Sequence, residues 1–157
     1  MTPWWRRLRY GLALIGLCAI ATCPQAKRAC VADVRPREAH ELLDQLATQV
    51  TAVVAATGKV PPVAAGPTPE TSCCARGGTC EPDPELWSAP GWRALQFSVD
   101  AAFRYRYEYV PDASGLSAVV RATGDPSCDD HAERIELRLD VRGDRVERTW
   151  TRTAVAE

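Results

Sequence analysis

The C-terminal third of the chain alternates apolar and polar residues with a period of two. Residues 103–109 alternate aromatic with charged side chains, and residues 135–142 alternate aliphatic with charged ones. Segments 116–122 and 146–153 complete the set, and the connections between the four segments are short. A period of two is typical of strands that bury one face, and short connections require antiparallel neighbours. The pattern predicts a four-stranded antiparallel meander whose apolar face needs a cover.

One upstream segment supplies that cover. Apolar residues recur there at spacings of three and four, as in an amphipathic helix. The stripe consists of Leu43, Leu46, Val50, Val53 and Val54. Pro36 suits a first helical turn, and Gly58 with Pro61-Pro62 suits the end of a helix. We therefore expect one long helix over 37–57, packed on the meander in an α+β domain over 37–157.

The segment between helix and meander is rich in proline and cysteine. Residues 59–84 contain Cys73, Cys74 and Cys80 and six of the twelve prolines. This composition disfavours both helix and strand, so a loop stapled by disulfides is expected, followed by a short helical turn within 87–95.

The first 21 residues resemble a secretory signal peptide. A basic stretch with Arg6, Arg7 and Arg9 precedes an apolar run over 10–21 that is too short to span a bilayer. The small residues around Ala19 and Ala21 predict cleavage after Ala21, followed by an extended tether over 22–36. Two alternatives stay open. In the first, the apolar run over 10–21 is not cleaved and serves as a short membrane anchor. In the second, residues 20–23 form a lipobox that directs lipidation of Cys23.

Export changes how the cysteines are interpreted. Removal of Cys18 with the leader reduces seven cysteines to six, whereas lipidation of Cys23 would leave five for pairing. An oxidising periplasm or exterior lets disulfides persist, so we expect a periplasmic or extracellular protein with disulfide bonds. The disulfide candidates are Cys23, Cys30, Cys73, Cys74, Cys80 and Cys128.

Composition excludes several classes of protein. The chain is 46% hydrophobic and 25% charged with a formal net charge of −1, which argues against wholesale disorder, a polytopic membrane protein and a strongly basic nucleic-acid binder. Removal of three arginines with the leader leaves 16 basic against 20 acidic residues, a net charge of −4. We expect no nucleic-acid partner, and membrane contact only through an uncleaved leader or a lipid anchor.

A series of landmarks runs through the middle of the chain in the order Cys73-Cys74, 77–82, Trp87, 91–97, 103–107, 122–125 and Cys128-Asp129. Together they resemble the landmarks of type IV pilin and pseudopilin globular domains with a paired-cysteine loop. The resemblance covers about residues 37–142 and implies a helix, a cysteine loop and an antiparallel meander that act through protein contacts. Members of that family begin with a hydrophobic helix carrying a glutamate at its fifth position. The apolar run over 10–21 has no acidic residue, so a free-standing or tethered pilin-like domain is expected and not a filament subunit.

Six cysteines allow 15 pairings, so their connectivity stays open. Cys73 and Cys74 are adjacent and their side chains diverge, so they are not expected to bond to each other. We expect one of the three loop cysteines to join Cys128 and to tie the loop to the sheet.

Some residue groups have a competing functional interpretation. Asp125, Ser127 and Asp129 could present oxygens to Ca²⁺, but a solvated turn is the preferred interpretation. Cys128 and His131 with the loop cysteines could form a zinc site, but disulfides are preferred. At 142–144 we favour a hairpin turn over an adhesive motif. Trp87 and Trp92 are expected to pack in the core and not to form a ligand platform. His40 and Asp44 are expected to form a surface pair on the helix.

No arrangement in the sequence indicates catalysis. His40 and His131 are the only histidines, and neither a nucleophile motif nor a glycine-rich phosphate loop is present. We expect no catalytic residues, no metal and no cofactor. The sequence therefore favours a non-enzymatic, exported, pilin-like protein that contacts other proteins at the cell envelope or in a pilus or secretion apparatus. The alternative is a small periplasmic lipoprotein or secreted binding module anchored through Cys23.

Overall fold

The computed structural model describes residues 24–155, and the long helix α2 occupies Pro24–Thr57. The described residues fall into two compact units that divide between Val34 and Arg35. The helix begins before the expected start at 37, so the extended tether predicted over 22–36 is wrong from Pro24 on. Alanine, glutamine, lysine and arginine dominate 25–29 and favour helix. The predicted leader, its cleavage after Ala21 and Cys23 lie outside the described residues.

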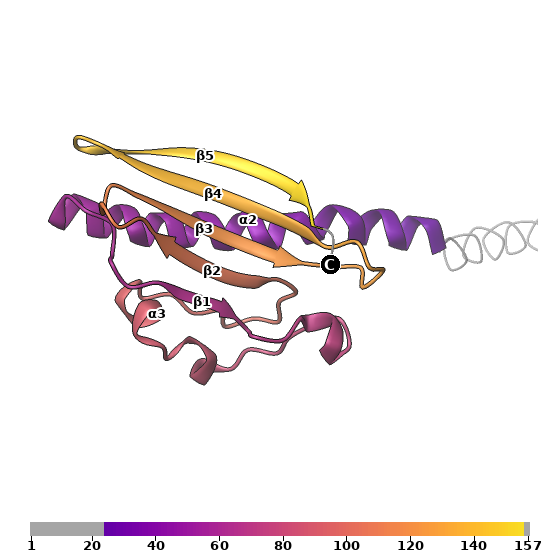
Figure 1. Ribbon diagram of the computed structural model, residues 1–157. Helices are drawn as coiled ribbons and strands as arrows, with labels where there is room; N and C mark the ends of the chain where they lie inside the picture. The colour runs from indigo at the N-terminus through magenta and orange to yellow at the C-terminus, as the bar shows by residue number, and fades with distance from the viewer. Residues whose placement is uncertain (1–23, 156–157) are drawn as a thin grey trace, which may run out of the picture. The chain divides into compact units, whose positions relative to one another are not determined.

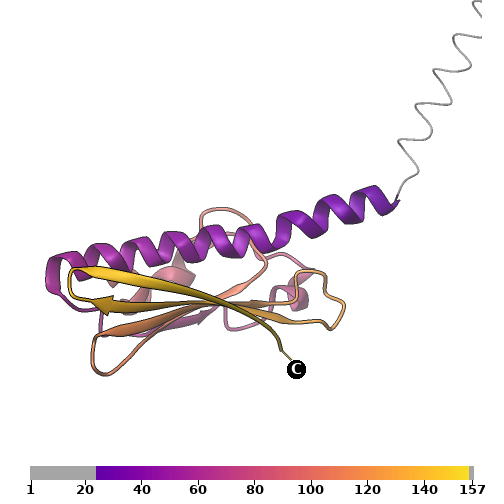
Figure 2. The ribbon, with the colours of Figure 1, turned by 90° about the horizontal axis from the view of Figure 1, so that it is seen from above.

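The second half of α2 covers one face of a β-sheet, as Figure 2 shows. Its inward side chains are fully or almost fully buried in the same core as the strands. They are Ala39, Leu43, Leu46, Ala47, Val50 and Val54. The helix ends at Gly58, which has a φ of +73° and donates its N–H to the Val54 carbonyl at 2.7 Å. The expected amphipathic helix on an antiparallel sheet is therefore confirmed for residues 37–57.

The sheet has five antiparallel strands in the order β1-β2-β3-β4-β5, which matches their order in the chain (Figure 1). The strands are β1 (Ala65–Thr68), β2 (Arg106–Pro111), β3 (Ser117–Gly124), β4 (Glu133–Arg142) and β5 (Arg145–Ala154). The last four are the predicted meander. The predicted number of four was wrong because β1 adds a strand at one edge.

Strand β1 lies inside the proline-rich segment that was expected to contain no strand. Ala65 pairs with Tyr109 and Thr68 with Tyr107, with an irregular register between them. Proline cannot donate to a ladder, but it is tolerated on an edge strand, which is where Pro67 lies. The buried Thr68 hydroxyl accepts a hydrogen bond from Trp92 Nε1 at 2.8 Å and fixes this edge to the core.

Three short helices complete the cover next to β1 and β2: η1 (Cys73–Arg76), η2 (Pro84–Trp87) and α3 (Pro90–Ala94). α3 confirms the helical turn expected within 87–95, and η2 precedes it. Trp87 and Trp92 are buried and meet edge to face, with ring centroids 5.3 Å apart. Both rings also contact Phe97, so the expected core packing of the two tryptophans is confirmed.

The opposite face of the sheet is polar. Glu108, Arg121 and Glu136 lie side by side on β2, β3 and β4. Arg121 bridges the two carboxylates, with Nη1 2.5 Å from Glu108 and Nε 2.6 Å from Glu136. Opposite charges on neighbouring strands stabilise the strand order on this face.

Candidate functional site

Strand β5 forms the edge of the sheet farthest from β1, drawn in yellow in Figure 1. All ten of its residues pair with β4 without a register shift. Most of its side chains are exposed, and Trp150 is one of the large hydrophobic residues on the surface, with 40% of its area accessible. A long, regular strand with one free edge is a template for pairing with another chain.

Side chains of α2 meet this strand along what we call the α2–β5 seam, formed by His40, Asp44, Thr51, Arg148 and Trp150. The His40 and Trp150 rings stack, with centroids 4.7 Å apart and an interplanar angle of 22°. Arg148 Nη1 lies 3.1 Å from Asp44 Oδ1, and Arg148 Nη2 donates to the Thr51 hydroxyl at 3.5 Å. The seam therefore presents an aromatic pair beside a neutralised arginine, a combination suited to contact with a protein chain.

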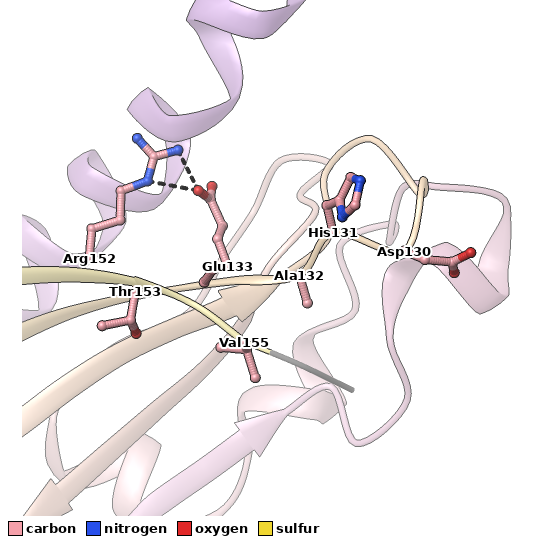
Figure 3. A pocket seen from close by; sticks show the side chains of 8 residues that line it. Asp130, His131, Ala132, Glu133, Arg152, Thr153 and Val155 are labelled. Atoms are coloured by element: carbon pink, nitrogen blue, oxygen red, sulfur yellow. Dashed lines mark hydrogen bonds and ion pairs between the residues drawn. The ribbon is translucent and has the colours of Figure 1, made fainter.

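A second group, the Glu133 cluster, consists of Tyr105, Glu133 and Arg152. Glu133 begins β4, and Figure 3 shows Arg152 reaching from β5 to its carboxylate. Arg152 Nε donates to Glu133 Oε2 at 2.8 Å, and the Tyr105 hydroxyl donates to Oε1 at 2.5 Å. These residues adjoin a pocket of about 550 Å³ whose lining includes Asp130, His131, Glu133 and Arg152.

Burial, together with the nearby carboxylates, keeps two tyrosines at this end of the core protonated. Burial raises the pKa of Tyr105, and the hydrogen bond to Glu133 and the charges of Glu133 and Glu38 raise it further. Burial and Glu38 likewise raise the pKa of Tyr107, whose hydroxyl donates to Glu38 at 3.3 Å. Glu38 also accepts the backbone N–H of Arg104 at 2.7 Å, which joins α2 to the segment that leads into β2. Both hydroxyls therefore act as hydrogen-bond donors and not as bases.

Two disulfides hold the loops at one end of the sheet. Cys73 bonds to Cys80, and Cys74 bonds to Cys128. The expectation that one loop cysteine joins Cys128 and that Cys73 and Cys74 do not bond to each other is confirmed. Of Cys30, only its place in α2 is described. The pairing also removes the thiolates that the zinc alternative needed.

The aspartate-rich segment 125–130 folds back on its own backbone. The Asp125 carboxylate accepts the N–H of Ser127 at 3.1 Å and that of Asp130 at 2.8 Å. Burial works against ionisation of Asp125, but these backbone donors outweigh it and lower the pKa. A carboxylate saturated by its own turn fits the expected solvated turn better than a calcium ligand.

Other predicted residues have simple structural roles. Gly143 and Asp144 form the two-residue turn between β4 and β5, and Gly143 has the φ of +64° that such a turn requires. His40 stacks on Trp150, and Asp44 pairs with Arg148. Sequence reasoning missed these partners because they lie about 100 residues away along the chain.

One signal for the seam was nevertheless present in the sequence. Arg148, Trp150 and Arg152 occupy the positions of β5 that pair with the buried Leu139, Leu137 and Ile135. Because paired residues point to the same face, two arginines there indicate that the last strand is only partly covered.

The chain shows no significant similarity to any family model, to any curated protein sequence or to any solved structure. Within the described part of the chain, no helix combines the length and the apolar character needed to cross a bilayer.

Proposed function

We propose that this chain is an exported, non-enzymatic, pilin-like protein that acts through protein–protein contacts at the cell envelope. The observation that carries the proposal is the succession of a long helix, a disulfide-bonded loop and an antiparallel meander around one core. It is the order of elements that the resemblance to pilin globular domains implies. Two disulfides are compatible with an oxidising compartment, which supports export.

The α2–β5 seam is the surface we assign to these contacts. Trp150 is a large exposed aromatic residue, and aromatic residues are enriched where proteins bind one another. The flanking ion pair of Arg148 and Asp44 is solvent-accessible, so it would set orientation more than affinity.

Cell fractionation with mass spectrometry tests the exported state. Protein recovered from the periplasmic or envelope fraction should begin at Thr22 and contain both disulfides. A diacylated Cys23 at the N-terminus would support the lipoprotein alternative instead. A full-length, fully reduced protein confined to the cytosol would contradict export in either form.

Photo-crosslinking tests the contact surface. A photo-reactive amino acid in place of Trp150 should crosslink to a defined protein in envelope extracts, because that position lies on the seam. The matched control is the same amino acid in place of Val63, which is 45% exposed but lies just before β1, the edge of the sheet opposite β5. Equal, diffuse labelling from both positions would argue against the seam as a contact surface.

A further inference from the structure

We propose that β5 pairs antiparallel with β5 of a second copy of this chain, about a twofold axis at Thr149, so that two five-stranded sheets join into one. The proposal rests on the assignment of the α2–β5 seam as the contact surface and names a second copy as its partner. It does not depend on export, because it concerns only the surface of the folded domain.

The two edges of the sheet differ in whether they can accept another strand. β1 has four residues, includes Pro67 and pairs irregularly with β2. Proline and irregular register are features that block pairing at an edge. β5 has ten residues, no proline and ten regular pairs with β4. Its valine, tryptophan and three threonines are strand formers, so β5 is the edge open to extension.

Hairpin geometry determines which backbone groups of β5 are available. A two-residue turn is closed by a hydrogen-bonded pair, here Arg142 and Arg145, and hydrogen-bonded pairs then alternate along the ladder. The N–H of Val155 donates to the Ala132 carbonyl at 2.9 Å, and this agrees with hydrogen-bonded pairs at the odd-numbered residues of β5. The odd-numbered residues therefore bond to β4. The even-numbered residues, from Val146 to Ala154, direct their N–H and C=O groups outward.

The charges on this edge are already compensated. The outward-bonding residues include Arg148 and Arg152, and unpaired cations at such positions would repel a second positively charged strand. Arg148 is 3.1 Å from Asp44, and Arg152 is bound to Glu133. Neutralised arginines leave the edge able to accept a copy of itself.

Self-complementarity selects the register. Only the even-numbered residues of β5 can form hydrogen-bonded pairs between the copies, so an even-numbered residue must face an even-numbered one. This requires the twofold axis to pass through a residue and not between two residues. Extensive overlap of the two strands then leaves Thr149, Trp150 and Thr151 as positions for the axis. An axis at Trp150 would place Arg148 directly opposite Arg152 of the second copy. Each guanidinium has one carboxylate partner on its own chain and none in the other copy, so two guanidinium groups brought face to face would still be unfavourable. An axis at Thr151 would shorten the overlap, because residues before Arg148 would lie beyond the end of the second β5.

An axis at Thr149 avoids both problems. It places Arg148 opposite Trp150 of the second copy, twice by symmetry, and a guanidinium beside an indole ring is a favourable contact. On the polar face it places Thr149 opposite itself and Glu147 opposite Thr151, with no like charges in register. It also covers the exposed Trp150 ring from the side that the His40 stack leaves open.

Disulfide crosslinking of single cysteine variants tests the register. Cys18, Cys23 and Cys30 are first replaced by serine in the full chain, so that the two native disulfides are kept. In the proposed pairing the two Thr149 residues form a non-hydrogen-bonded pair with Cα atoms about 4.5 Å apart, within disulfide range. The two Thr151 residues are offset by four positions, about 13 Å, and cannot be bridged.

Under mild oxidation, Thr149→Cys should give a covalent dimer with at least tenfold higher yield than Thr151→Cys or Thr153→Cys. All three residues are exposed on β5, so circular dichroism should show the same fold for each variant. Strongest crosslinking from Thr151→Cys, or equal yields from all three, would overturn the proposed register.

Sedimentation equilibrium of the native chain tests the pairing without any engineered cysteine. Trp150→Ala should weaken dimerisation at least tenfold, whereas Val63→Ala, an equally exposed residue elsewhere, should leave it unchanged. A monomer at all accessible concentrations would overturn the proposal. Crosslinking of Thr149→Cys to a different envelope protein in such a case would assign the edge to another chain.

Discussion

Glu133 joins three separate parts of the chain at one end of the sheet. Its carboxylate accepts from Tyr105 and from Arg152, and its side chain is only 14% exposed. A poorly solvated carboxylate of this kind depends on its donors, and each donor would lose a charged partner if the carboxylate were removed.

Glu133→Gln should therefore lower the free energy of unfolding by about 1.5 to 3 kcal/mol, the range for hydrogen bonds to charged groups. Urea unfolding at pH 7 measures the change. Glu147→Gln is the matched control, because Glu147 is 67% exposed and lies 3.6 Å from Arg142, so its effect should stay within about 0.5 kcal/mol. Equal effects of the two substitutions would contradict this account of Glu133.

The role of Glu133 was not predictable from its position in the sequence. Tyr105 and Arg152 are 28 and 19 residues away. A glutamate at the start of a charged, alternating strand has the appearance of any solvent-facing residue. Only the folded sheet brings its two donors together, because β5 lies beside β4 and the residue before β2 comes within reach of the start of β4.

At the scale of elements, β2 and the residue before it organise the core through three tyrosines, Tyr105, Tyr107 and Tyr109. Each hydroxyl leaves the core toward a different segment: Tyr105 toward β4, Tyr107 toward Glu38 of α2, and Tyr109 toward the Pro61 carbonyl at 2.7 Å. All three side chains are fully buried, and burial is the main cause that raises the pKa of each.

A raised tyrosine pKa predicts loss of stability in alkali. The unfolded chain ionises near pH 10, whereas the folded chain keeps these hydroxyls protonated. The free energy of unfolding should therefore be constant below pH 10 and fall above it, by about 1.4 kcal/mol for each tyrosine at pH 11. Urea unfolding between pH 8 and 11 measures this fall.

The phenylalanine variants supply the control for that experiment. Tyr109→Phe removes one ionisable hydroxyl while keeping the ring, so its stability should fall less steeply above pH 10 than that of the native protein. If the two curves run parallel between pH 10 and 11, the buried tyrosines are not the cause of the alkaline transition.

Periodicity predicted those elements whose burial is one-sided. The stripe from Leu43 to Val54 and the alternation along β2, β3 and β4 are direct consequences of one face packing on a common core. β1 escaped prediction because an edge strand needs hydrogen bonds on one side only and so accepts Pro67. The start of α2 escaped because Pro36 suits a first turn, although the structure places it inside the helix.

At the scale of the whole molecule, the two disulfides differ in how much of the chain they constrain. Cys74–Cys128 closes a separation of 54 residues and joins the cysteine loop to the connection before β4. Cys73–Cys80 closes only 7 residues within one loop. In the chain-entropy model the stabilisation grows with the logarithm of the loop length.

Paired substitution should separate these contributions. Cys74→Ala with Cys128→Ala is expected to cost about 4 kcal/mol in the free energy of unfolding, against about 2.5 kcal/mol of loop entropy for Cys73→Ala with Cys80→Ala. Cys73 and Cys80 are also buried, so the second variant loses some packing as well. Urea unfolding of both variants checks the order, and a larger cost for the short loop would show that packing outweighs chain entropy here.

Reduction of both disulfides together affects the fold as a whole. A domain of about 120 residues has a net stability of roughly 5 to 15 kcal/mol, so losing both constraints removes a large share of it. The reduced protein should be cleaved by thermolysin at 37 °C at least tenfold faster than the oxidised protein, because cleavage follows the population of unfolded chain. Oxidised protein treated only with a thiol-alkylating reagent is the control for effects of any free cysteine. If reduced and oxidised proteins resist the protease equally, the core alone maintains the fold, and its dependence on an oxidising compartment is refuted.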